Sequence, residues 1–319
     1  MKTISKIILL AFTLMTFSCE DVLEDDITNE IIQTISPIEG EVVSSNVVNF
    51  QWNIQKGADK YRVQVYNANQ AIVLDSLVEN KSNLTYPLLA GAYKWRVRGE
   101  NFGYQSTYSF PVSFSVVQST NLTSQQVVLS SPVNSLYTNN TSLTCTWQDL
   151  IPADYYELEL INVTAGQTIV YQQSNITNTS VTLNSASLVQ NAEYQWKIKA
   201  VNTTSQTPFS SRNFFIDRVN ANQSQNSLPA NNTTQIVNQA ITFSWTSPAD
   251  TGIIQSQISY LIEFSNTSTF ATITQTSNSA TATFQQTFTA AGDYYWRVKA
   301  TDAAGNSSTY SIPFKFTIN

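Results

Sequence analysis

Apolar and polar side chains alternate along several short segments of the chain, and the clearest such segment recurs three times. At 93–98 the apolar residues (Tyr, Trp, Val) alternate with basic ones, and 194–199 and 294–299 follow a similar pattern. A period of two with one apolar face predicts a half-buried strand of an antiparallel sheet. No segment has the helical period of three to four residues, so the pattern predicts an all-β chain.

The tryptophans divide the chain into three equivalent repeats. Corresponding tryptophans are 95–101 residues apart, and none is left over. The three pairs are Trp52 and Trp95, Trp147 and Trp196, and Trp245 and Trp296. Each pair lies between a proline-containing start and a closing apolar stretch. Repeats of about 95 residues with several short alternating strands predict small β-sandwiches.

The repeats resemble a known family through two features: a tryptophan on an early strand, and a late Tyr-x-Trp-x-Val-x-Ala segment. This combination resembles the fibronectin type III domain, an immunoglobulin-like β-sandwich. The resemblance implies three tandem domains, at 36–117, 127–217 and 227–319, with all six tryptophans in the cores. It also implies a tyrosine corner in each domain, in which a hydroxyl bonds to nearby main chain. The corner residues are Tyr93, Tyr194 and Tyr294.

The start of the chain resembles a bacterial export signal. Two lysines precede an apolar run from Ile7 to Phe17, which suits the core of a signal peptide and is too short to cross a bilayer. The run ends at Ser18-Cys19, and this resembles a lipobox in which Thr16 replaces the usual leucine. The resemblance implies a signal peptide at 1–18 and a lipid on Cys19, which would anchor the protein to a membrane.

An acidic segment follows the cysteine. It contains six carboxylates and no basic residue: Glu20, Asp21, Glu24, Asp25, Asp26 and Glu30. We expect residues 19–35 to form a solvated tether. The segment also resembles the signal that sends Bacteroidetes lipoproteins to the cell exterior. The resemblance implies an outer-membrane lipoprotein that faces the outside.

The composition argues against catalysis. The chain has no histidine and only two cysteines, which excludes a Ser-His-Asp triad and histidine or cysteine metal sites. Without the signal peptide the net charge falls from −6 to −8, of which the acidic segment carries −6 and the three repeats only −2. A nearly neutral body argues against nucleic acid as a partner. We predict that the protein is not an enzyme and has no cofactor and no metal site.

Three groups of residues could be taken for reactive or metal-binding sites, but each has a simpler structural explanation. Cys145 stands where the other repeats have phenylalanine, so we expect a buried core thiol. Asp302 and Asn306 could help to bind calcium, but a single carboxylate in an Asx-type turn is better explained by the turn itself. The last group should form ion pairs between neighbouring strands. It consists of Glu157, Glu159, Lys197 and Lys199.

Differences between the repeats indicate where function lies. The third repeat has an insertion at 247–256, which we expect in a loop at one end of the sandwich. The first repeat has an aromatic loop at 101–108, with Phe102, Tyr104 and Tyr108 beside Asn and Gln. These rings are candidate ligand contacts, because aromatic rings stack on sugars and anchor protein partners. The simpler explanation is that Phe102 and Tyr104 cover the open end of the core.

Two functions remain open. The first is a non-catalytic binding or adhesion lipoprotein for a glycan or a surface protein, of the kind that accompanies polysaccharide utilisation. The alternative is a structural spacer that binds no small ligand. Fold by itself does not decide between them.

Overall fold

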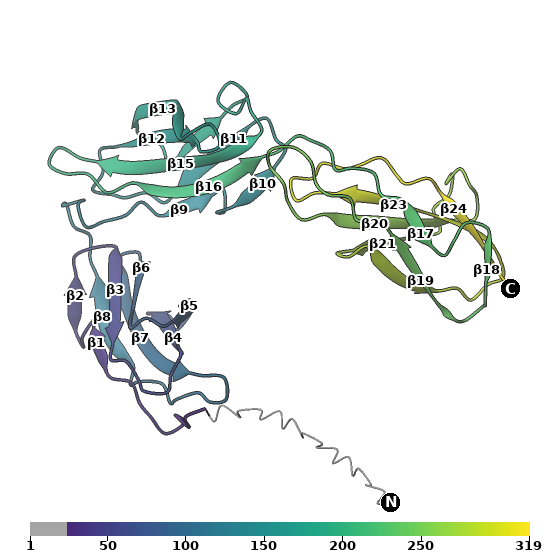
Figure 1. Cartoon of the computed structure of the whole chain (residues 1–319). Helices are drawn as coiled ribbons and strands as arrows, with labels where there is room; N and C mark the ends of the chain where they lie inside the picture. The colour runs from purple at the N-terminus through teal and green to yellow at the C-terminus, as the bar shows by residue number, and fades with distance from the viewer. Residues whose placement is uncertain (1–23) are drawn as a thin grey trace, which may run out of the picture. The chain divides into compact units, whose positions relative to one another are not determined.

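The computed structural model describes residues 24–319, so the predicted signal peptide and Cys19 lie outside the described residues. Every regular element in the described part is a β-strand (Figure 1). It contains no helix long and apolar enough to span a membrane. The chain divides into two compact units, Met1–Val43 with Val48–Val117, and Ser44–Val47 with Gln118–Asn319. The first unit holds one β-sandwich and the second holds two.

Module 1 contains eight strands in two sheets. They are β1 (Thr34–Ser36), β2 (Glu41–Val43), β3 (Val47–Trp52), β4 (Lys60–Asn67), β5 (Ile72–Glu79), β6 (Asn83–Pro87), β7 (Gly91–Glu100) and β8 (Val112–Val116). One sheet has the order β1-β3-β6 and the other β2-β8-β7-β4-β5. The pairs β1–β3, β4–β5, β4–β7 and β7–β8 are antiparallel, and β2 and β8 run parallel.

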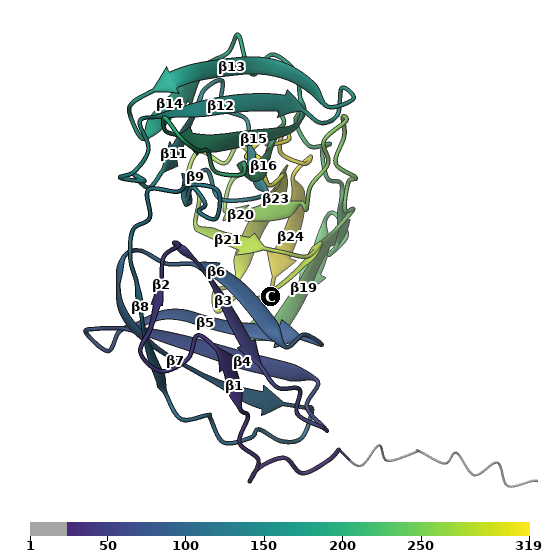
Figure 2. The ribbon, with the colours of Figure 1, turned by 90° about the vertical axis from the view of Figure 1, so that its left-hand side faces the viewer.

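Module 2 repeats this topology. Its strands are β9 (Leu129–Ser131), β10 (Leu136–Thr138), β11 (Leu143–Trp147), β12 (Tyr155–Asn162), β13 (Thr168–Ile176), β14 (Ser180–Leu183), β15 (Ala192–Val201) and β16 (Ser210–Ile216). The sheets have the orders β9-β11-β14 and β10-β16-β15-β12-β13. Figure 2 shows β13, β12 and β15 side by side in the larger sheet.

Module 3 has the same arrangement. Its strands are β17 (Asn226–Leu228), β18 (Thr233–Gln235), β19 (Ala240–Trp245), β20 (Ser259–Ser265), β21 (Gln275–Ser279), β22 (Thr283–Thr287), β23 (Gly292–Thr301) and β24 (Phe314–Ile318). The sheets have the orders β17-β19-β22 and β18-β24-β23-β20-β21. The predicted fold class is confirmed: the chain consists of three tandem β-sandwiches with the fibronectin type III arrangement of strands.

The tryptophans lie between the two sheets of each module. All six are at most 4% exposed, and Trp95, Trp196 and Trp296 are fully buried. The alternation of β7, β15 and β23 therefore turns one face of each strand into the core. Each module also has a tyrosine whose hydroxyl donates to a main-chain carbonyl four residues earlier. The pairs are Tyr93 to Leu89 (2.9 Å), Tyr194 to Gln190 (3.2 Å) and Tyr294 to Ala290 (3.0 Å).

The outer face of module 2 shows the expected ion pairs. Strands β12 and β15 place Glu157 opposite Lys199 and Glu159 opposite Lys197. The corresponding N–O distances are 2.9 Å and 2.7 Å. These glutamates therefore form cross-strand pairs, as predicted, and do not form a paired-carboxylate site.

The prediction of a tether over residues 19–35 needs a correction in its second half. Strand β1 begins at Thr34, and Ile27 and Ile32 are only 2% and 3% exposed. Both isoleucines pack beside Gly99, since a Cβ at that glycine would lie 3.7 Å and 3.6 Å from their Cδ1 atoms. Burying these two apolar side chains holds the segment against module 1, although acidic residues surround it in the sequence.

Candidate functional site

The aromatic loop of module 1 joins β7 to β8 at one end of the sandwich. Phe102 is 95% exposed and Tyr104 is 40% exposed. The explanation that Phe102 covers the end of the core is therefore wrong. Ile27 and Ile32, which belong to the predicted tether, are buried at this end beside Gly99. Unlike these two isoleucines, the ring of Phe102 lies in water.

Asn101 holds the loop in shape. Its side-chain oxygen accepts hydrogen bonds from the main-chain N–H groups of Gly103 (3.1 Å) and Tyr104 (2.7 Å). Its amide nitrogen donates to the carbonyls of Asp25 and Gly57, both at 2.8 Å. These four bonds fix the loop around Phe102. They also use the side-chain amide of Asn101, the Asn that lies beside the rings in the sequence.

Tyr108 lies apart from the loop tip and has a packing role. Its half-buried ring stacks on the guanidinium groups of Arg96 and Arg98, with the carbon atoms 4.1 Å and 4.7 Å from the ring centre. Burial raises the pKa of its hydroxyl. Phe209 and Tyr310 stack on the basic residues of β15 and β23 in the same way. The ring is therefore a repeated element of the fold, a feature that alignment of the three repeats could have revealed.

A third exposed ring lies just after the loop. Phe110 is 81% exposed, although its sequence places it in the apolar stretch that closes the first repeat. It borders an open groove of about 550 Å³. The groove is lined by Ile31, Ile32, Gln33, Thr34, Ser109, Phe110 and Val112. Because β8 begins only at Val112, Phe110 is outside the strand and free of the core.

Four charged residues on the larger sheet of module 1 are joined by ion pairs: Arg62, Asp75, Arg98 and Glu100. Glu100 accepts from Arg62 (2.8 Å) and Arg98 (2.9 Å), and Arg62 also contacts Asp75 at 3.0 Å. Burial raises the pKa of the Glu100 carboxyl, but the two arginines outweigh this effect and hold the pKa below its usual value. A carboxylate that is paired twice and kept ionised is suited to structure and not to general-acid chemistry.

The other residues singled out in the sequence have structural surroundings. Cys145 is fully buried, and burial raises the pKa of its thiol to about 12. Asn306 donates to both carboxylate oxygens of Asp302 at 2.8 Å, from its main-chain and side-chain nitrogens, so the expected turn is present. Two further buried aspartates accompany this turn, and no motif in the sequence indicates that they lie there.

The fold and the loop together define a class of protein: a string of fibronectin type III-like sandwiches with an exposed aromatic loop on the first. No protein-family model and no curated protein matches the chain. Among solved structures it is similar to the FN1-FN3 domains of chicken CNTN1, with 17% identity, a TM-score of 0.41 and coverage of 90% of this chain and 96% of that one. It is also similar to the fibronectin(III)-like modules of Clostridium thermocellum CbhA, with 13% identity, a TM-score of 0.23 and coverage of 58% and 94%. Because both TM-scores are below 0.5, the fold is assigned from the strand order of this chain, and no function is inferred from the two similar structures.

Proposed function

We propose that the protein is a non-catalytic lipoprotein of the cell surface that binds a glycan or a surface protein through the loop of module 1. The observation that carries the proposal is the 95% exposure of Phe102 on a loop fixed by Asn101. Keeping a phenylalanine in water forgoes about 1.5–3 kcal/mol relative to burying it. A partner that covers the ring recovers this free energy without having to order the loop.

The chemistry of the surface suits a partner with a flat apolar face. Phe102 and Tyr104 are exposed at the loop tip, and Phe110 is exposed where the loop ends. Aromatic side chains of this kind anchor protein partners and stack on sugar rings. The absence of histidine from the sequence and the pairing of Glu100 with arginines support a role without catalysis.

A binding screen with the full chain tests the proposal. The chain is applied to a glycan array and used to capture cell-surface proteins, and each bound partner is titrated against Phe102→Ala. Loss of the ring is expected to weaken binding at least tenfold. Ile312→Ala is the matched control, because Ile312 is 77% exposed and belongs to module 3. Equal binding by the wild-type chain and Phe102→Ala would show that the partner binds elsewhere.

One observation favours the alternative function of a spacer. In the second unit, Asn306 donates to the carbonyl of Asp217 (3.0 Å) and accepts from the amide of Asn139 (3.2 Å). These bonds tie module 3 to the end of module 2, and a spacer benefits from such a fixed connection. Failure of both screens to yield any partner, with the chain folded, would favour the spacer.

The membrane anchor is proposed from the sequence alone. Cys19→Ala is expected to abolish incorporation of a labelled fatty acid in cells and to release the protein from membranes. Proteolysis of intact cells then tests whether the modules face the outside. Unchanged labelling in Cys19→Ala, or full protection from the protease, would contradict this part of the proposal.

A further inference from the structure

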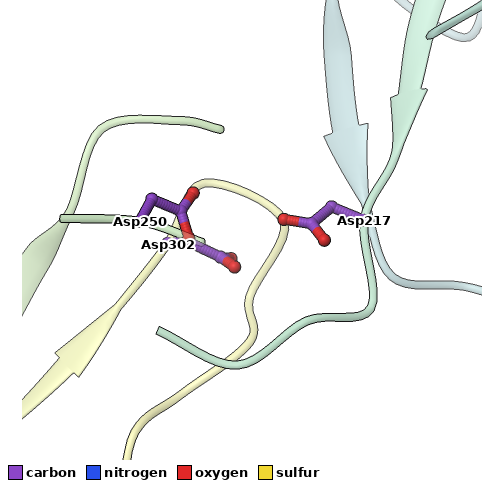
Figure 3. A group of neighbouring side chains, drawn as sticks. All are labelled: Asp217, Asp250 and Asp302. Carbon is purple, nitrogen blue, oxygen red and sulfur yellow. The ribbon is translucent and has the colours of Figure 1, made fainter. Parts of the chain in front are cut away.

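Three aspartates that are far apart in the sequence meet where module 2 ends and module 3 begins, within the second unit. Asp217 follows β16, Asp250 belongs to the insertion at 247–256, and Asp302 follows β23. One carboxylate oxygen from each lies within 4.8 Å of the other two. Figure 3 shows the Asp217 carboxylate directed toward the other two. The three residues are only 1%, 8% and 4% exposed.

The negative charge of this aspartate cluster (Asp217, Asp250 and Asp302) is not balanced by the residues around it. None of the three takes part in an ion pair with another described residue. In addition, Oδ2 of Asp217 is buried and accepts no hydrogen bond within the described part of the chain. Isolated buried carboxylates are strongly disfavoured unless they are paired, protonated or bound to a metal. Burial raises the pKa of Asp217, and the charges of Asp302 and Asp250 raise it further.

Hydrogen bonds orient the carboxylates of Asp250 and Asp302. Main-chain N–H groups of Thr251 and Ser256 donate to the two oxygens of Asp250, both at 2.8 Å. Both oxygens of Asp302 likewise accept from Asn306. Oδ2 of Asp250 also accepts from the hydroxyl of Ser256 at 3.4 Å, whereas Oδ1 of Asp250 and both oxygens of Asp302 keep a second lone pair for another ligand. Carboxylates that bind metals are commonly held in this way by donors behind them.

At the position of Asp302, the other two modules have an uncharged asparagine. Asn101 and Asn202 follow β7 and β15 as Asp302 follows β23. Each amide nitrogen donates to two main-chain carbonyls. A carboxylate cannot donate, so Asp302 lacks these bonds. Asp217 likewise corresponds to Val117 of module 1. The N–H of Asp217 donates to the carbonyl of the last residue of β10, and the N–H of Val117 donates to that of the last residue of β2. The junction of modules 2 and 3 therefore has the acceptors Asp302 and Asp217 where the corresponding positions hold a donor (Asn101, Asn202) or an apolar group (Val117).

We propose that Asp217, Asp250 and Asp302 together bind one calcium ion. Calcium prefers oxygen ligands at about 2.3–2.6 Å, which places oxygens on opposite sides of the ion up to about 4.6–5.2 Å apart. Three oxygens that all lie within 4.8 Å of one another are close enough for one such ion to contact them together. Magnesium, at about 2.0–2.1 Å, needs a tighter octahedral cage. The site replaces the expectation of a chain without metal, and it links the end of module 2 to two loops of module 3.

Calorimetric titration of the full chain with calcium chloride, after treatment with a chelator, tests the proposal directly. One ion per chain is expected to bind, with a dissociation constant below about 1 mM, the upper limit of extracellular calcium modules. At a free calcium concentration one hundred times the dissociation constant, the Tm of the second unit is expected to be about 5–10 °C higher than without calcium. Magnesium chloride is expected to bind at least tenfold more weakly.

Variants separate calcium binding from a general effect on folding. In Asp217→Asn the side-chain oxygen can still accept from Val219, and the new amide can donate to the neighbouring carboxylates. This variant is expected to be at least as stable as the wild type without calcium and to lose the calcium-dependent rise in Tm. Asp302→Asn, which copies the residue of modules 1 and 2, is expected to lose it too. Asp154→Asn is the matched control, because Asp154 is exposed and accepts a main-chain N–H in module 2.

Three results would overturn the proposal. The first is an absence of binding and of any change in Tm up to 10 mM calcium, on the order of ten times the expected limit. The second is unchanged calcium affinity in Asp217→Asn. The third is a pH-dependent stability that is identical with calcium and with chelator, which would mean that the cluster is held by a shared proton instead.

Discussion

Trp95 and Trp196 occupy the same position in modules 1 and 2, and both are fully buried, but only one has a hydrogen bond. Nε1 of Trp95 donates to the carbonyl of Pro37 at 3.0 Å. The corresponding carbonyl in module 2, that of Pro132, is bonded instead by Arg212 at 2.7 Å. Nε1 of Trp196 has no partner among the described residues. Replacing each tryptophan by phenylalanine therefore removes the same volume but different polar interactions.

The difference between the two variants can be estimated. The cavity left by Trp→Phe is common to both and cancels in the comparison. Trp95→Phe also loses a hydrogen bond and leaves a buried carbonyl without its donor, at a cost of about 1–3 kcal/mol. Trp196→Phe removes a buried N–H that was already without a partner, so it carries no such cost. We expect Trp95→Phe to lower the free energy of unfolding by about 1–3 kcal/mol more than Trp196→Phe does.

Hydrogen exchange followed by mass spectrometry suits a chain of several modules, because it reports each module separately. The amides of β7 and β15 that exchange only on unfolding are compared between variant and wild type. The expected difference corresponds to about a 5- to 150-fold larger increase in exchange for Trp95→Phe. Equal increases, or a larger one for Trp196→Phe, would refute the reasoning that the indole hydrogen bond stabilises module 1.

Four more predictions follow from the burial or exposure of single residues. Cys145 should react with thiol reagents only as fast as module 2 unfolds, and rapid labelling of the native chain would contradict its core position. Because burial raises the pKa of this thiol from 9.0 to about 12, its contribution to stability is complete below pH 9 and is lost as the pH rises toward 12; alkaline titration of Cys145→Ala should lack this loss. Gly99→Ala should destabilise module 1 by about 1–3 kcal/mol in urea unfolding, because the new methyl would lie 2.9 Å from the Cβ of Ala58; no effect would mean that this contact relaxes freely. Phe102→Ala should change stability by less than about 0.5 kcal/mol, and a larger loss would show that the ring packs within the fold.

The chain's local patterns were enough to predict the architecture. Alternation with a period of two is a property of each strand by itself, because successive side chains point to opposite faces. Three copies of the same alternation, each with two tryptophans, then indicate three sandwiches. The core position of Cys145 followed by comparison with the phenylalanines of the other repeats. All of these inferences rely on neighbours in sequence or on equivalence between repeats.

The tertiary structure decided the features that depend on residues distant in sequence. The burial of Ile27 and Ile32 beside Gly99 is one such feature, because both come from a segment that is acidic and polar in sequence. The closeness of Asp217, Asp250 and Asp302 likewise arises only when the end of one module packs against two loops of the next. Each aspartate by itself is an ordinary loop residue. Burial and charge become informative only when the packing of distant segments removes those groups from water.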